Sequence, residues 1–189
     1  IEKNILFMST PYDFESVDLL AELGVEIYKV ASSDLDNVAL LAHIARANRP
    51  IILSTAMSEI EEIDYSVSIL RQNQIEDIVV MQCVGDYPAP ANEANLKSMI
   101  EFERRYNVVV GYSDHVANRA IGLASIALGA KVYEKHFTLS NFLPGPDHRA
   151  SIMPEELESL IKDVRTIESA LGGNGNQIMP SEKKNKLRL

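Results

Sequence analysis

The sequence predicts an α/β fold of the (β/α)8, or TIM-barrel, type that is present only in part, with about six βα units and the first two missing. Apolar, β-branched segments of strand length alternate with segments whose apolar residues recur every three or four positions. Repetition of this unit implies a parallel sheet with helices outside it. Polar residues gather directly after the apolar segments, as they do at the carboxyl ends of barrel strands.

The expected elements follow one another in alternation. Strands are expected at residues 5–8, 26–30, 51–54, 78–84, 108–111 and 131–134. Helices are expected at residues 14–23, 38–47, 59–72, 94–106, 118–128 and 154–171. Gly24 and Gly129 stand where helices should end, and Pro154 stands where the last one should begin.

A doubly wound sheet is the competing architecture. Such sheets usually carry a glycine-rich phosphate loop, and the sequence has neither G-x-G-x-x-G nor a P-loop. Six strands in a barrel arc would leave two open edges and an exposed interior. We therefore expect residues 1–172 to be the catalytic portion of a longer barrel, with two units before Ile1; a six-unit sheet is the alternative. Residues 173–189 are expected to be a linker that leaves the domain.

The composition favours a folded, soluble, cytoplasmic protein. No run approaches the ~20 apolar residues of a membrane helix, and no basic and apolar leader opens the chain. The net charge of −9 and the lack of a basic cluster with aromatics argue against a nucleic-acid partner. The single cysteine, Cys83, lies in an apolar run, where a buried structural thiol is favoured over a catalytic one.

Two histidines follow two successive expected strands. Neighbouring parallel strands would bring His115 and His136 to the same rim of the sheet, about 5 Å apart, where two imidazoles can share one metal ion. The alternative is a pair of rim histidines held by hydrogen bonds, and the spacing alone does not decide between them. Because side chains alternate across a strand, Ser113 should share a face with His115, and Glu134 with His136.

The opposite faces of these two strand ends carry Asp114 and Lys135. These two residues are expected to form an ion pair or to support the histidines from behind.

Lys29, Ser32 and Ser54 follow earlier strands and together form a plausible cradle for a phosphate or carboxylate. Lys29 could instead be a Schiff-base lysine, or could form an ion pair with a neighbouring carboxylate such as Asp34. Asp34 itself lies within reach of the same rim and could act as a general acid or base.

Two loops add further candidates. Asp147 lies in a Gly-Pro-Asp turn after the last strand, where a carboxylate could bind sugar hydroxyls or only stabilise the turn. Tyr87 opens the rigid loop Tyr87-Pro88-Ala89-Pro90.

Several motifs occur together in one order along the chain. They are Ser9-Thr10-Pro11-Tyr12-Asp13, Tyr28-Lys29-Val30-Ala31-Ser32, Ile52-Leu53-Ser54-Thr55-Ala56-Met57, Tyr87-Pro88-Ala89-Pro90, Gly111-Tyr112-Ser113-Asp114-His115, Glu134-Lys135-His136-Phe137-Thr138 and Gly145-Pro146-Asp147-His148. In this register they resemble the bacterial sialic acid synthase family, from residue 5 to the tail. The segment 145–151 looks more like the sialic and legionaminic acid branch than the pseudaminic one.

The resemblance implies an enzyme on a (β/α)8 barrel. It would condense phosphoenolpyruvate with N-acetylmannosamine or a related 2-acetamido sugar, using a divalent metal, Mn²⁺ or Mg²⁺. The chain looks like the third to eighth βα units of such an enzyme. A small antifreeze-like domain would follow residues 173–189, and it would reach into the partner's site in a domain-swapped homodimer.

The resemblance also implies roles for residues of this chain. His115 and His136 look like the metal ligands. Asp34 matches a carboxylate that assists proton transfer, and Asp147 looks like a contact to the hydroxyls of the amino sugar. The phosphoenolpyruvate contacts would be Lys29, Ser32, Ser54, Tyr87 and Ser113. Gly85 departs from the Asn or Ser that the family usually has, so one phosphate contact is not matched.

Two other functional hypotheses remain beside this one. A Schiff-base aldolase on the same barrel would use Lys29 or Lys135. Alternatively, the 189 residues are a non-catalytic fragment of the synthase that folds or binds without turnover.

Overall fold

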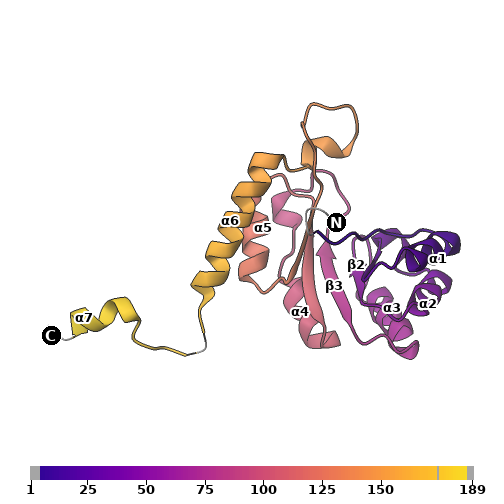
Figure 1. Cartoon of the computed structure of the whole chain (residues 1–189), viewed down its shortest axis with the longest axis horizontal. Coiled ribbons are helices and arrows are strands. Elements are labelled where there is room, and N and C mark those ends of the chain that lie inside the picture. Colours follow the sequence, from indigo (N-terminus) through magenta and orange to yellow (C-terminus); the bar gives the residue numbers. More distant parts are fainter. Residues whose placement is uncertain (1–4, 174, 187–189) are drawn as a thin grey trace.

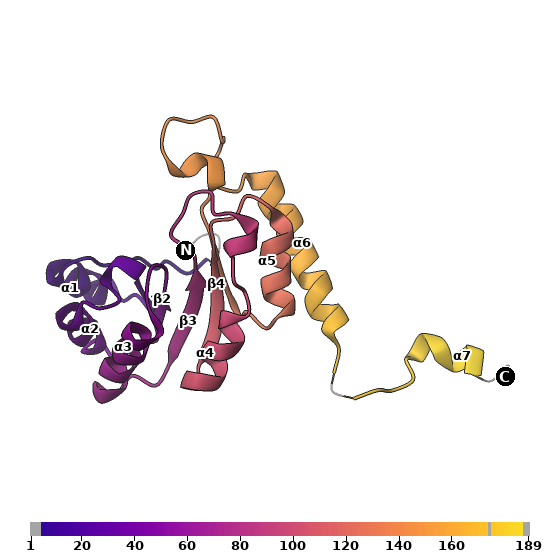
Figure 2. The same ribbon diagram turned by 180° about the vertical axis from the view of Figure 1, so that it is seen from behind.

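The computed structural model of the chain describes residues 5–173 and 175–186. Five parallel strands form one sheet in the order β1-β2-β3-β4-β5. They are β1 (Tyr28–Val30), β2 (Ile51–Ser54), β3 (Ile78–Cys83), β4 (Val109–Asp114) and β5 (Val132–Lys135). Strands that are neighbours in the sequence are neighbours in space, as the barrel prediction requires. The sheet is curved, with α1 to α3 toward one end and α5 and α6 at the other (Figures 1 and 2).

The helices alternate with the strands along the chain. The longer ones are α1 (Phe14–Glu22), α2 (Val38–Ala45), α3 (Ile60–Gln72), α4 (Ser98–Tyr106), α5 (Arg119–Ala127) and α6 (Pro154–Leu171). The short ones are η1 (Ser32–Asp34), η2 (Ala91–Glu93), η3 (Asp147–Ala150), η4 (Pro180–Glu182) and α7 (Lys183–Lys186). None of the described helices is both long and apolar enough to span a membrane.

Local chemistry explains where several of the helices begin and end. The Asp13 carboxylate accepts a hydrogen bond from the Ser16 backbone N–H (2.7 Å) and caps α1, and Gly24, with φ of 71°, follows its end. Asn118 caps α5 by accepting a hydrogen bond from the Ala120 N–H (2.9 Å). Pro154 occupies the first turn of α6, where its missing N–H costs no helical hydrogen bond. Each of these boundaries lies within a few residues of its expected position.

The strands divide their side chains between two environments. Alternate residues face the helices and join one apolar core with them, among them Tyr28, Leu53, Val80, Val110 and Tyr112. The residues between them, such as Lys29, Ser54, Cys83 and Ser113, point to the other side of the sheet. This second side would be the interior of a closed barrel, and these polar residues stand toward the carboxyl ends of the strands.

One expected strand does not form. Residues 5–8 have no strand structure, and the side chains of Ile5, Leu6 and Phe7 are 75%, 69% and 66% exposed. One backbone hydrogen bond links the segment that follows to β1, from the Lys29 N–H to the Ser9 carbonyl oxygen (3.5 Å). A strand is stabilised by pairing on its sides, and residues 5–8 have a neighbour on one side at most. The sheet therefore has five strands instead of the six that the apolar pattern predicted.

The C-terminal region leads away from the sheet (Figure 1). Residues 173–189 were expected to be a linker, of which residue 174 and residues 187–189 lie outside the described residues. Residues 175–179 form neither helix nor strand, and the side chains described between 175 and 186 are exposed. Residues 1–4 of the expected barrel portion also lie outside the description.

Candidate active site

A cavity of about 500 Å³ lies at the carboxyl ends of the strands. Every strand, or the loop directly after it, contributes to the lining. Parallel strands end at the same edge of a sheet, so side chains far apart in the sequence converge there. The residues in the lining are Thr10, Tyr12, Lys29, Ala31, Ser32, Ser33, Ser54, Ala56, Met57, Cys83, Gly85, Tyr87, Ser113, His115, Glu134, Lys135 and His136.

Seven of the nine site residues expected from the sequence line this one cavity. They are Lys29, Ser32, Ser54, Tyr87, Ser113, His115 and His136. The two others, Asp34 and Asp147, are not in the lining. The register explains the convergence, since Cys83 pairs with Ser113 and Ser113 pairs with Glu134 across three adjacent strands.

An ion pair forms the base of the cavity. The Lys29 ammonium lies 3.5 Å from Oε2 of Glu134, and the Lys29 side chain is only 8% exposed. The Ser113 hydroxyl donates a hydrogen bond to Oε1 of the same carboxylate (2.7 Å). The cation that the sequence placed here is therefore paired with Glu134. The expected ion pair of Lys29 with a neighbouring carboxylate is confirmed, but the partner is Glu134 and not Asp34, whose carboxylate accepts hydrogen bonds from Ser33 and Asn37.

Ser54 presents a polar atom that is ready for a ligand. Its hydroxyl is buried in the lining and finds no hydrogen-bond partner among the described residues. A buried hydroxyl without a partner costs free energy, so such a group usually has a bound molecule to satisfy it. The nearby Ser32 hydroxyl accepts a hydrogen bond from the Ala56 N–H (2.9 Å) and keeps its own proton for donation. These hydroxyls and the Lys29 ammonium fit an anionic group.

The two histidines meet at the rim as the spacing predicted. Their ring centroids are 5.3 Å apart. The Tyr87 ring is tilted by 30° against that of His115, with 4.0 Å between the centroids, and meets the His136 ring edge-on at 5.2 Å. The cis peptide bond between Tyr87 and Pro88 belongs to the loop that brings this ring over both imidazoles.

The environment of His115 favours a neutral ring with an unprotonated Nε2. Nδ1 lies 2.6 Å from the Val84 carbonyl oxygen, and because a carbonyl can only accept, Nδ1 carries the proton and donates it. Burial lowers the pKa of His115 below its ordinary value, which keeps the ring uncharged. The lone pair then lies on Nε2, the arrangement found in metal-binding histidines whose other nitrogen donates to a backbone carbonyl.

The donor set fits a divalent ion held by two imidazoles. Among the described residues, no group of three or more His, Cys, Asp or Glu side chains is arranged around a common metal position. Within the described part of the chain, the candidate metal ligands are therefore His115 and His136. Metal binding by these two residues stays a prediction.

Cys83 is buried next to the histidines. Its thiol sulfur lies 3.7 Å from Nδ1 of His115, and the residue is 7% exposed. Burial raises the pKa of the Cys83 thiol, so it stays protonated and poorly nucleophilic. The burial predicted for Cys83 is confirmed, and the thiol also contributes to the cavity wall.

Asp34 and Asp147 lie beside the cavity instead of in it. The Asp34 carboxylate, in η1, accepts hydrogen bonds from the Ser33 hydroxyl and the Asn37 side-chain amide, both at 3.2 Å. Asp147, at the start of η3, has a carboxylate oxygen 3.8 Å from Nδ1 of His136. The proton-transfer role expected for Asp34 and the sugar contact expected for Asp147 both remain predictions.

Sequence reasoning left other lining residues without a role. The sequence places Glu134 on the same face as His136. The same alternation of side chains could have predicted its ion pair with Lys29. Nothing in the sequence pattern indicates Met57, whose backbone is left-handed with φ of 61°. A Cβ at Gly85 would lie 3.0 Å from Cγ of Met57, so the glycine leaves room for this side chain at the mouth.

Comparisons with known proteins agree with the fold. Residues 1–176 match the NeuB family. An N,N'-diacetyllegionaminic acid synthase of Campylobacter jejuni is 46% identical over 184 residues, which are 96% of this chain and 55% of that protein. The N-acetylneuraminate-9-phosphate synthase of Homo sapiens is 35% identical over 182 residues, 96% of this chain and 50% of that protein. The chain spans about half the length of these curated relatives.

Solved structures give the same result. An N-acetylneuraminic acid synthetase from Leptospira borgpetersenii, in complex with citrate, superimposes with a TM-score of 0.91 at 35% identity. The match covers 99% of this chain and 65% of that one. A truncated 3-deoxy-D-arabino-heptulosonate 7-phosphate synthase from Thermotoga maritima has a TM-score of 0.78 at 18% identity, which shows a shared fold alone.

Proposed function

The chain belongs to the NeuB family, and from this premise we propose that it is the barrel portion of a sialic-type acid synthase. The enzyme condenses phosphoenolpyruvate with N-acetylmannosamine or a related 2-acetamido sugar and releases a nonulosonic acid and phosphate. The observation that carries the proposal is that one cavity holds the Lys29 ammonium, several hydroxyl groups and two imidazoles together. The complete enzyme is proposed to be a cytoplasmic homodimer.

The base of the cavity holds the phosphoenolpyruvate in this proposal. Lys29 supplies a buried positive charge, and Ser54 supplies a hydroxyl that lacks a partner among the described residues. Ser32, Ser113 and Tyr87 line the same cavity and add hydroxyl groups around the anion. Fixing the substrate in this way lowers the entropic cost of the condensation.

The rim receives the sugar. His115 and His136 would hold the divalent metal, Mn²⁺ or Mg²⁺, which supplies Lewis acidity at the aldehyde oxygen of the open-chain sugar. C3 of phosphoenolpyruvate forms the new bond to the aldehyde carbon, water adds at C2, and phosphate leaves with cleavage of the C–O bond. Asp147, whose carboxylate lies 3.8 Å from Nδ1 of His136, is proposed to contact the hydroxyls of the sugar.

Product mass spectrometry tests this proposal. Phosphoenolpyruvate is incubated with Mn²⁺ and one of three sugars: N-acetylmannosamine, its 6-phosphate, or a 2,4-diacetamido hexose of the legionaminic type. The assay is run on the 189-residue chain and on the complete gene product that contains it. A nonulosonic acid with stoichiometric phosphate supports the proposal, and no turnover of any sugar by the complete protein overturns it. Activity in the complete protein alone would identify the 189 residues as a non-catalytic portion.

The Schiff-base aldolase is separated by two reagents. Lys29 and Lys135 are both buried, and each amine is engaged in an ion pair, with Glu134 and with Asp114, instead of being free to attack a carbonyl group. We therefore expect EDTA to abolish condensation, and borohydride with pyruvate to leave the protein mass unchanged. A covalent adduct trapped on either lysine would favour the aldolase.

A further inference from the structure

A second polar cluster lies behind the two histidines, on the face of the sheet that packs against α5 and α6. Asp114, Tyr133 and Lys135 contribute to it, and all three line a separate cavity of about 320 Å³. The side chain of Asp114 is 1% exposed and that of Lys135 is 9% exposed. These charges are buried although the proposed chemistry does not use them, so their position calls for another role.

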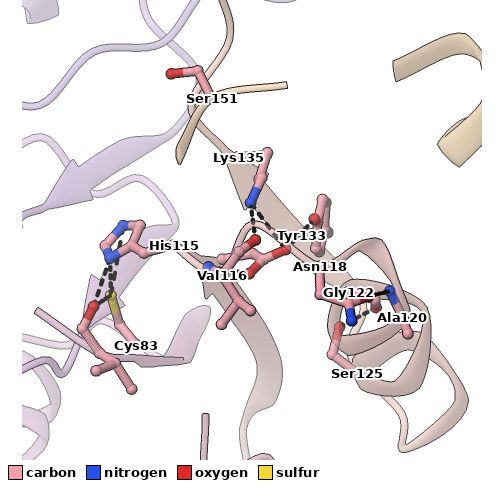
Figure 3. Close-up of polar contacts among 12 residues, drawn as sticks. Cys83, His115, Val116, Asn118, Ala120, Gly122, Ser125, Tyr133, Lys135 and Ser151 are labelled. Atoms are coloured by element: carbon pink, nitrogen blue, oxygen red, sulfur yellow. Dashed lines mark hydrogen bonds and ion pairs between the residues drawn. The ribbon is translucent and has the colours of Figure 1, made fainter. Parts of the chain in front are cut away.

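Lys135 joins the ends of two strands. Its ammonium donates a hydrogen bond to the Val116 carbonyl oxygen (2.6 Å) and lies 3.3 Å from Oδ2 of Asp114 (Figure 3). Both partners belong to the end of β4 and the loop that follows it, whereas Lys135 is the last residue of β5. The Asp114 carboxylate also accepts hydrogen bonds from the Val116 N–H (2.9 Å) and the Tyr133 hydroxyl (2.6 Å).

Lys135 contacts the two residues that flank His115 in the sequence. Asp114 and Val116 are the residues on either side of His115, and Lys135 precedes His136 directly. A shift of the Lys135 ammonium would therefore disturb the Val116 carbonyl group and the Asp114 carboxylate, on the two sides of one imidazole, and Lys135 is itself bonded to the residue that carries the other. In Figure 3 the Lys135 side chain reaches toward Val116 and Tyr133, while the His115 ring is directed toward Cys83.

We propose that Lys135, through its contacts with Asp114 and Val116, is a positioning residue that holds His115 and His136 at the separation needed to share a metal ion. The proposal rests on the proposed function for the role of the two imidazoles. Lys135 does not act on substrate in it. Its effect on the reaction passes through the backbone that carries the histidines.

Energetic considerations favour positioning over simple stability. A buried ion pair costs desolvation of both charges, and apolar side chains of similar size often stabilise a protein as well or better. What an apolar pair could not provide is the directed hydrogen bond to the Val116 carbonyl. Helix α5 also leaves room for this cluster, since a Cβ at Gly122 would lie 2.7 Å from the Tyr133 hydroxyl. Gly122 in α5 thus leaves the space in which Tyr133 reaches Asp114.

The test uses a double variant, so that no buried charge is left without a partner. Lys135→Met alone would leave the Asp114 carboxylate uncompensated and could unfold the protein, whereas Asp114→Asn with Lys135→Met removes both charges. Tyr133→Phe is a milder change that deletes one hydrogen bond to Asp114 and keeps the ring. Lys162→Met is the matched control, because Lys162 forms an exposed ion pair with Glu158 on α6.

Two readouts are taken on the complete protein. The first is the set of histidine ring signals in ¹⁵N NMR spectra of the metal-free protein, which contains four histidines within these 189 residues. His43, which pairs with Asp18 far from the sheet edge, serves as the internal reference. The second is the affinity for Mn²⁺ alone, measured by calorimetry.

We expect the double variant to fold, to shift the ring signals of His115 and His136 but not of His43, and to bind Mn²⁺ about tenfold or more weakly. Tyr133→Phe should give smaller changes of the same kind, and Lys162→Met none. Unchanged ring signals in the double variant, or in Tyr133→Phe if the double variant does not fold, would overturn the proposal. If the parent protein itself binds no Mn²⁺, the proposed function fails, while the ring signals still decide whether Lys135 positions the histidines.

Discussion

Gly111→Ala should destabilise the protein, because the new methyl group would collide with backbone. Gly111 pairs with Val132 between β4 and β5. A Cβ at this position would lie 2.7 Å from the Val132 carbonyl oxygen and 3.1 Å from the side chains of Met81 and Val132. A flexible side chain could move aside, but a carbonyl oxygen in a sheet moves only with its strand. The two strands that carry the candidate metal ligands would therefore have to separate locally.

The size of the effect follows from this geometry. Overpacking of a well-packed interior costs about 1–3 kcal/mol, and an obstacle made of backbone places Gly111→Ala at about 2–3 kcal/mol. For a chain of this length, each 1 kcal/mol lowers the melting temperature by about 2–4 °C. Urea denaturation followed by circular dichroism should show a lower midpoint with an unchanged slope, because the surface exposed on unfolding stays the same.

Gly173→Ala is the matched control for this experiment. No described atom lies within 4 Å of the position of its Cβ, and its φ is not left-handed. The same Gly-to-Ala change there should be neutral or slightly stabilising, since alanine reduces the conformational entropy of the unfolded chain. If Gly111→Ala and Gly173→Ala have the same urea midpoint, the close approach of β4 and β5 is not as described.

Two further predictions concern charged groups. Lys29→Met should weaken phosphoenolpyruvate binding about 10- to 150-fold in calorimetry, because charge-assisted hydrogen bonds contribute about 1.5–3 kcal/mol, and a change below twofold would contradict the cradle. Hydrogen bonds from Arg105 lower the pKa of Asp64 below 3.8. Asp64→Asn should therefore cost about 0.2–1 kcal/mol of unfolding free energy at pH 7, and this cost should disappear as the pH falls through the lowered pKa. Urea midpoints of both proteins at pH 7 and at the lowest pH where they fold test this; a difference that grows on acidification would contradict the pairing.

The sequence predicted the convergence of the polar residues better than it predicted the edge of the sheet. The polar residues after the strands were assigned to one rim on the rule that parallel strands end together, and seven of them line one cavity. The segment at residues 5–8 has the apolar composition of a strand, but composition does not supply a partner. Strand formation depends on pairing between distant segments, and the apolar pattern alone does not contain that information.

Asp34 illustrates a different limit. Its position soon after β1 correctly predicts that it lies near the site, yet its carboxylate is engaged by Ser33 and Asn37 within η1 and the turn that follows it. Short polar side chains readily form such local hydrogen bonds, and these decide the direction of a side chain in a loop. Distance along the sequence limits where a loop residue can lie, but it does not show which way the residue points.

The alternation of side chains at the end of β5 fixes the register of the whole strand, beyond the positions of single residues. At the end of β5, Glu134 and His136 face the site, while Lys135 reaches the buried Asp114 behind it and borders both cavities. A shift of β5 by one residue would exchange these faces and place the ammonium of Lys135 where the imidazole belongs. Such a shift would also break the contact of Lys135 with Val116 and leave the Asp114 charge buried without its partner. The residues behind the site therefore make a one-residue shift of β5, which would also destroy the site, energetically unfavourable.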